Sequence, residues 1–124
     1  MEEQRKYIRL PDSLIIGYRV VNSFLRSSSR SKDISEGGVC LSSFQRFDRG
    51  VVLELKIQLP EFIEPIIVVG EVKWLRETGD AQLPFLLGVK FIKIDPRERD
   101  KLCEHIHRVS QDKKEEKNNI EWGA

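Results

Sequence analysis

The sequence predicts an all-β domain with one C-terminal helix, specifically a six-stranded antiparallel barrel that the helix closes. Six short apolar or alternating segments follow one another within about 80 residues, a density typical of small barrels. The connections between these segments are too short to hold the helices that parallel strands require. A helix-capping sequence follows the sixth segment. These observations predict a closed or nearly closed barrel.

The six predicted strands follow from apolar alternation bounded by turn residues. The clearest is 52–59, where Leu53, Leu55 and Ile57 alternate with polar residues and indicate a half-buried antiparallel strand. Glycines separate the second strand from the third, and a polar turn at 77–80 separates the last two. The six segments are 13–21, 30–33, 39–42, 52–59, 66–75 and 85–94.

The closing helix begins with a capping box after the last strand. Asp95 suits the N-cap, Pro96 the first helical position and Glu98 the third, where its carboxylate can reach back to the cap. Apolar residues then recur at helical spacing and form one stripe, Leu102, Ile106 and Val109. We expect this stripe to cover an open end of the barrel.

The two ends of the chain differ from the barrel in composition. Residues 1–12 carry positive charges and few apolar residues, so we expect a flexible arm. We expect residues 13–109 to form the barrel with its closing helix. Residues 110–124 are charged and have no apolar face to bury, which predicts a solvated helix extension or a loose tail. Ile120 and Trp122 interrupt this polarity, and docking on the barrel or on a partner stays open for them.

Composition argues against several classes of protein. The formal net charge is +1, from 21 Lys and Arg against 20 Asp and Glu, which disfavours a globally basic nucleic-acid binder. No apolar run approaches the roughly 20 residues of a membrane span, and the first residues lack the apolar core of a signal peptide. We therefore expect a cytoplasmic protein.

The cysteines and histidines predict neither a disulfide framework nor a metal site. Cys40 and Cys103 have no CxxC or Cys/His spacing, and we expect both to be reduced. His105 and His107 are two residues apart, so on a helix they point in different directions and cannot chelate one metal. We expect both histidines to be surface or boundary residues, and we expect no metal.

Two short motifs carry the functional signal, Arg5-x-x-x-Arg9 and Asp33-x-Ser35-x-x-Gly38. The two arginines present guanidinium forks that suit phosphate oxygens and the O6/N7 edge of guanine. Asp33 offers a carboxylate to guanine N–H groups, Ser35 offers a hydroxyl, and Gly38 lets backbone approach a ligand closely. Together the motifs can make a guanine and phosphate binding site.

These motifs, in this order and at this separation, resemble the PilZ domain, the bacterial receptor module for cyclic di-GMP. The stretches 70–74 (Gly-Glu-Val-Lys-Trp) and 87–91 (Leu-Gly-Val-Lys-Phe) resemble later strands of that family, and the helical pattern after Asp95 resembles its closing helix. The resemblance covers about residues 5–109. It implies the PilZ barrel, cyclic di-GMP as a ligand with no further cofactor, and a bacterial cytoplasmic receptor without catalytic activity.

The resemblance also implies a mechanism. We expect Arg5 and Arg9 to be mobile without ligand and to fold over cyclic di-GMP when it binds beside the second motif. The ordered arm would signal by contact with an unidentified downstream protein, in motility, exopolysaccharide or biofilm control. Gln4 stands where the family often has another arginine or an apolar residue, so binding of one ligand or of an intercalated pair stays open. Monomer and weak dimer stay open as well.

Other functions fit the residues less well. The main alternative is an adaptor barrel that binds protein and no nucleotide, but both ligand motifs are intact. An RNA or single-strand DNA binder would display aromatics and basic residues on one strand face, whereas Phe24, Phe44 and Phe47 lie in loop-like stretches. No Ser/His/acid set or carboxylate pair predicts an enzyme. Trp74 is expected in the core and not as a stacking platform.

Overall fold

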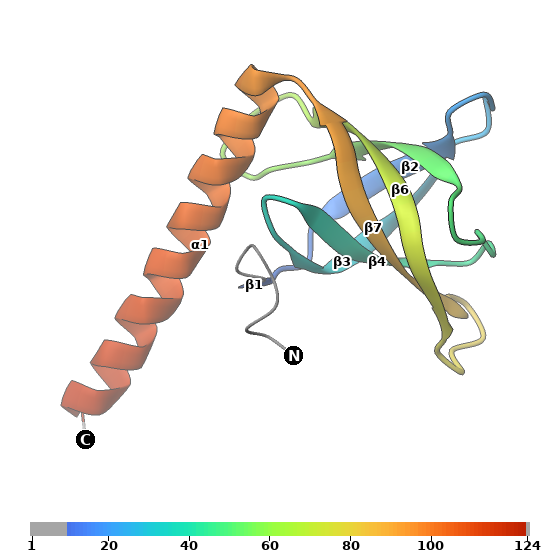
Figure 1. The fold of residues 1–124 in the computed structure, drawn as a ribbon. Coiled ribbons are helices and arrows are strands. Elements are labelled where there is room, and N and C mark those ends of the chain that lie inside the picture. Colours follow the sequence, from blue (N-terminus) through green and yellow to red (C-terminus); the bar gives the residue numbers. More distant parts are fainter. Residues whose placement is uncertain (1–9, 124) are drawn as a thin grey trace.

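The computed structural model describes the backbone of residues 10–123 and the side chains of residues 11–111. In this part of the chain one antiparallel sheet rolls into a barrel, and a long helix stands beside it (Figure 1). The elements in chain order are β1 (Leu10–Pro11), β2 (Ile15–Val20), β3 (Ser27–Ile34), β4 (Gly38–Ser43), β5 (Val52–Ile57), β6 (Ile66–Glu77), β7 (Phe85–Ile94) and α1 (Pro96–Gly123).

Six strands close the barrel. The hydrogen-bonded order is β1-β3-β2-β5-β6-β7-β4, and an additional pairing between β3 and β4 joins the two sides. Every pairing is antiparallel, because turns and loops connect the strands without an intervening helix. The predicted six-stranded antiparallel barrel is therefore confirmed. β1 is a two-residue addition that pairs with the end of β3.

Alternating side chains fill the interior of the barrel. On β5 Leu53 and Leu55 are fully buried, as the period-two pattern predicts. Tyr18 on β2 also points inward, with its ring edge-on to Phe47 at a centroid distance of 5.9 Å and its hydroxyl 3.2 Å from the Ser43 hydroxyl. Because this hydroxyl has a hydrogen-bond partner, the tyrosine occupies the core without an unpaired polar atom.

β3 begins earlier than the sequence indicates. It spans Ser27–Ile34, whereas the apolar pattern marks only 30–33. In the β2–β3 hairpin Tyr18 stands opposite Ser27 and Ile15 opposite Arg30, which extends the strand. Serine is not a strong strand former, so residues 27–29 become a strand through pairing with β2 and not through a local preference.

The first half of α1 packs against the barrel. The Asp95 carboxylate caps the helix by accepting a hydrogen bond from the Arg97 backbone N–H at 2.9 Å. Leu102 and Ile106 are buried in the same core cluster as the strand residues, and Val109 packs partly buried against it. The predicted apolar stripe therefore covers the barrel core.

The second half of α1 continues as helix to Gly123, which is the helical extension that the sequence left open for residues 110–124. The side chains of Ile120 and Trp122 lie outside the described residues, so their docking stays a prediction. No helix within the described residues combines the length and apolar character that crossing a membrane requires.

His105 is buried, contrary to the expectation of a surface or boundary position. Its side chain is 2% exposed and lies between two carboxylates. Its Nδ1 is 2.8 Å from Oε1 of Glu61, in the β5–β6 loop, and its Nε2 is 2.5 Å from Oδ2 of Asp12. Helical spacing does not reveal these partners, because they are 44 and 93 residues away in the sequence. His107 is exposed, as expected.

Candidate ligand-binding site

The structure brings the ends of the two sequence motifs together. β1 begins directly after Arg9 and pairs with the last residues of β3, with Pro11 opposite Asp33. The chain that leaves the RxxxR motif therefore runs beside the first residue of the DxSxxG motif. Arg5 and Arg9 themselves lie outside the described residues.

Asp33 stands half-buried on the outer wall of the barrel. It lies opposite Cys40, while the next pair along the two strands, Ile34 and Val39, is buried in the core. The register shifts between Ser31 and Asp33. Ser31 is buried, so regular alternation would also turn Asp33 inward, and the bulge reverses this. The bulge therefore places a carboxylate on the face that a ligand can reach.

Ser35 holds the turn between β3 and β4. Its side chain is buried, and its Oγ accepts a hydrogen bond from the Gly37 N–H at 3.2 Å. The same hydroxyl donates to the Gly38 carbonyl at 3.4 Å, and the Ser35 backbone N–H donates to that carbonyl at 2.9 Å. These bonds are those of a local turn former, the role that serine often takes in tight turns.

Gly38 is required by the close approach of β4 and β7. A Cβ at this position would lie 2.4 Å from the backbone carbonyl oxygen of Val89. Left-handed backbone is not the reason, because the glycines with positive φ in the described chain are Gly50 and Gly79. The glycine of the motif thus fixes how closely the turn sits on the barrel wall.

Trp74 lies on the outer wall and not in the core, which corrects the expectation from sequence. The strand registers place Asp33, Cys40, Gly88 and Trp74 in one row across four neighbouring strands. A Cβ on Gly88 would come within 2.1 Å of the indole, so the ring lies against the bare backbone of that glycine. The guanidinium carbon of Arg76 is 5.2 Å from the ring centroid. The row therefore ends in a partly exposed aromatic side chain with an arginine beside it.

An open depression of about 540 Å³ adjoins the meeting point of the two motifs. Pro11 and Asp12 line it from the arm, Arg30 and Lys32 from β3, and Ser42 from β4. Both cations are exposed, and the sequence prediction omitted them. They precede the motif aspartate on the same strand, which is the sequence signal that could have found them. They add positive charge where an anionic ligand would lie.

The helix α1 contacts both parts of the candidate site. Through His105 it reaches Asp12, at the base of the arm. Burial, and then the neighbouring Glu36 carboxylate in the turn of the second motif, raises the pKa of the Cys103 thiol. The helix therefore lies beside both the base of the arm and the turn of the second motif.

The described part of the site contains no candidate metal centre. Among the described residues, no three or more His, Cys, Asp or Glu side chains converge as metal ligands would. Neither Cys40 nor Cys103 forms a disulfide among the described residues.

The model of the PilZ domain family matches residues 3–108, which include both motifs and every described strand. This chain belongs to the PilZ domain family. The resemblance carried by the two motifs is thereby confirmed over most of the sequence. No curated protein matches the chain.

Solved PilZ structures share the fold at low sequence identity. The Bacillus subtilis inhibitor of motility MotI/DgrA matches with a TM-score of 0.75 and 20% identity over 89% of this chain and 52% of the other. The PilZ domain of Escherichia coli YcgR, solved with c-di-GMP, matches with a TM-score of 0.68 and 13% identity over 93% and 98% of the two chains. The K. pneumonia MrkH–c-di-GMP complex matches with a TM-score of 0.66 and 17% identity over 89% and 55%. The chain thus spans about half of MotI and of MrkH, and nearly all of the isolated YcgR domain.

Proposed function

We propose that this PilZ domain is a cytoplasmic receptor for cyclic di-GMP, which it binds between its N-terminal arm and the DxSxxG turn. The observation that carries the proposal is the pairing of β1 with β3, which places Pro11, two residues after Arg9, opposite Asp33. Structures of the same fold from YcgR and MrkH contain c-di-GMP, which supports the choice of ligand. We assign the domain no catalytic step.

In this proposal the arm and the barrel wall bind different parts of the ligand. Arg5 and Arg9 take phosphate oxygens and the Hoogsteen edges of guanine, and Asp33 accepts hydrogen bonds from guanine N–H groups. Ser35 contributes a hydroxyl, and with Gly38 it keeps the turn in the shape that presents the aspartate. Arg30 and Lys32 of β3, which line the depression beside Asp33, add long-range attraction for the phosphates.

The proposed signal passes from the arm to α1. Ligand binding orders the arm, whose base is Asp12, and the contact between the Asp12 carboxylate and the His105 imidazole connects this base to the helix. A downstream protein then reads the changed surface of arm and helix. The similar fold of an inhibitor of motility supports motility as one output, beside exopolysaccharide and biofilm control.

The proposal is tested by calorimetric titration of the full chain with cyclic di-GMP, with GTP as the comparison ligand. The site variants are Arg9→Ala and Asp33→Ala. Arg49→Ala, which removes an exposed arginine from the β4–β5 loop, is the matched control. We expect saturable binding by the wild type and by the control, a loss of about 100-fold or more in the site variants, and no comparable affinity for GTP.

Absence of binding by the folded wild type contradicts the receptor proposal and leaves an adaptor barrel as the function. Equal loss in Arg9→Ala and Arg49→Ala shows general electrostatic attraction and contradicts the assigned site. The molar ratio at saturation decides between one bound ligand and an intercalated pair, the point that Gln4 leaves open.

A further inference from the structure

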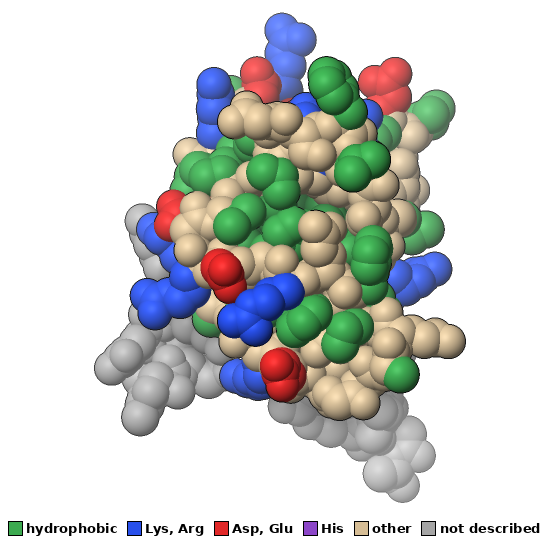
Figure 2. Space-filling view, turned by 90° about the vertical axis from the view of Figure 1, so that its right-hand side faces the viewer, with side chains coloured by type: hydrophobic (Ala, Val, Ile, Leu, Met, Phe, Trp, Pro, Cys, Tyr) green, Lys and Arg blue, Asp and Glu red, His purple; other side chains and the backbone are tan. Residues whose placement is uncertain are grey.

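The tip of the β2–β3 hairpin presents two neighbouring apolar side chains to solvent. Phe24 is 102% exposed and Leu25 is 84% exposed. Phe44 of the adjoining β4–β5 loop is also exposed, while Phe47 of that loop lines a small cavity together with Leu25. Figure 2 looks at the side of the molecule away from α1, where hydrophobic side chains gather among a few charged ones. Exposed apolar side chains that adjoin in this way mark an interaction surface.

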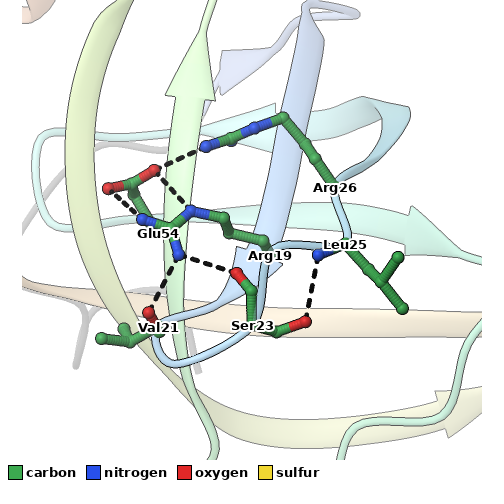
Figure 3. A network of polar contacts seen from close by, with 6 residues as sticks. All are labelled: Arg19, Val21, Ser23, Leu25, Arg26 and Glu54. Atoms are coloured by element: carbon green, nitrogen blue, oxygen red, sulfur yellow. Dashed lines mark hydrogen bonds and ion pairs between the residues drawn. The ribbon is translucent and has the colours of Figure 1, made fainter.

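Hydrogen bonds hold this tip in one shape (Figure 3). Arg19 Nη1 donates to the carbonyl oxygens of Val21 at 2.9 Å and of Ser23 at 2.8 Å. Its Nε and Nη2 donate to the two carboxylate oxygens of Glu54 at 3.0 and 3.1 Å. The Ser23 hydroxyl accepts from the Leu25 N–H at 3.1 Å. The backbone that carries the apolar pair is therefore organised before any partner arrives, which lowers the entropy lost on binding.

Positive charge surrounds the base of the tip. One carboxylate, Glu54, pairs with both Arg19 and Arg26, so an unneutralised positive charge remains there. The two arginines hold the pKa of Glu54 below its usual value, which keeps it ionised. The loop 44–51 contributes two further arginines and one aspartate. The apolar tip thus stands above a net positive base.

We propose that the β2–β3 tip docks on the anionic surface of a membrane. Phe24 and Leu25 enter the boundary between headgroups and lipid chains, and the net positive base faces the lipid phosphates. The projecting shape favours this partner, because a fluid bilayer can adapt to a convex tip whereas a protein partner must offer a matching pocket. Its charge favours the same partner, since a positive base complements an anionic leaflet.

Docking in this way leaves the rest of the molecule accessible. The tip and α1 lie on opposite sides of the barrel (Figure 1), so the helix points away from the membrane. The proposed docking uses the β2–β3 tip and its positive base and is independent of cyclic di-GMP binding. Binding should be weak and reversible, because even one myristoyl chain anchors a protein only marginally. It should also weaken as salt screens the arginines.

The test is co-sedimentation of the full chain with vesicles of phosphatidylcholine containing about one-third phosphatidylglycerol, compared with phosphatidylcholine alone. The site variant is the double change Phe24→Ser and Leu25→Ser. Ile63→Ser is the matched control, because Ile63 is 96% exposed in the β5–β6 loop outside this tip. We expect binding to the anionic vesicles only, lowered about tenfold or more in the double variant and unchanged in the control.

A second measurement reports directly whether the tip inserts into the bilayer. Phe24→Trp should shift its fluorescence emission to the blue and be quenched by brominated lipid in the anionic vesicles, whereas Ile63→Trp should do neither. Wild-type protein that binds neither vesicle overturns the proposal and assigns the tip to a protein partner. Equal loss in the double variant and in Ile63→Ser also overturns it, because general hydrophobic adsorption explains that result. Circular dichroism checks that each variant is folded.

Discussion

The imidazole Nε2 of His105 on α1 lies 2.5 Å from the carboxylate of Asp12, which joins the closing helix to the base of the N-terminal arm. The other ring nitrogen lies within 2.9 Å of both carboxylate oxygens of Glu61. Each ring nitrogen therefore has a carboxylate within hydrogen-bonding distance. One buried side chain therefore connects the arm, the helix and the β5–β6 loop.

Removing this imidazole should destabilise the fold. His105→Ala leaves the Asp12 and Glu61 carboxylates without their shared partner, and we expect a loss of about 2 to 4 kcal/mol in the free energy of unfolding. Urea denaturation measures it. The exposed neighbour gives the control, since His107→Ala should change stability by about 0.5 kcal/mol or less. Equal effects of the two changes would contradict a structural role for the buried contact.

Cyclic di-GMP should stabilise the folded chain by mass action. If the ligand binds only folded protein, a free concentration 100 times the dissociation constant raises the free energy of unfolding by about 2.7 kcal/mol. Denaturation with and without ligand measures this increment. Arg9→Ala should lose the increment at the same concentration while keeping the unfolding midpoint of ligand-free protein. A change in that ligand-free midpoint would instead indicate that the arginine supports the fold.

Gly88 and Gly38, two of the glycines with blocked Cβ positions, should respond differently to alanine. Gly88→Ala collides with the Trp74 ring, which can move, and we expect a loss of about 1 to 3 kcal/mol and altered tryptophan fluorescence. In a Trp74→Ala background the same change should cost less than about 1 kcal/mol. Gly38→Ala collides with backbone at Val89, so its larger cost should be the same in both backgrounds. For each glycine, thermal unfolding is measured for the wild type, the two single variants and the double variant with Trp74→Ala. The difference gives the coupling energy between that glycine and Trp74.

Acid should weaken the contribution of Glu54 to stability. Hydrogen bonds from Arg19 and then from Arg26 lower the pKa of this carboxylate in the folded state. A lowered folded pKa gives stability that is fully present above the usual glutamate pKa and is lost as pH falls through the folded value. The advantage of wild type over Glu54→Gln in urea should therefore be present at pH 7 and shrink by about pH 3. An advantage that is independent of pH would contradict this role, and Glu64→Gln at an exposed site is the control.

Local patterns were sufficient to predict much of the fold. The alternation at Leu53, Leu55 and Ile57 identified a strand because burial on one face repeats every second residue. The capping residue Asp95 located the start of α1 because its carboxylate binds the next free backbone N–H. The barrel closure followed from the number of strands and their short connections.

Other features depend on residues that are distant in the sequence, and local patterns could not reveal them. The partners of His105 come from the arm and from a strand connection, so helical spacing gave the wrong expectation. Trp74 has the alternation of a strand residue, but only the strand register shows that it covers Gly88 on the outer wall. Arg30 and Lys32 line a depression that exists only once the strands are paired, so the sequence alone did not mark them as site residues.

The ring of hydrogen bonds that closes the barrel runs through β3 and β4 and bypasses β1. β1 adds only two residues to the end of β3, so separating it interrupts no pairing between the six closing strands. The closure of the barrel therefore does not depend on the arm that is proposed to recognise the ligand. A different arm could be grafted before Asp12 to give a different ligand preference, while the barrel remained closed.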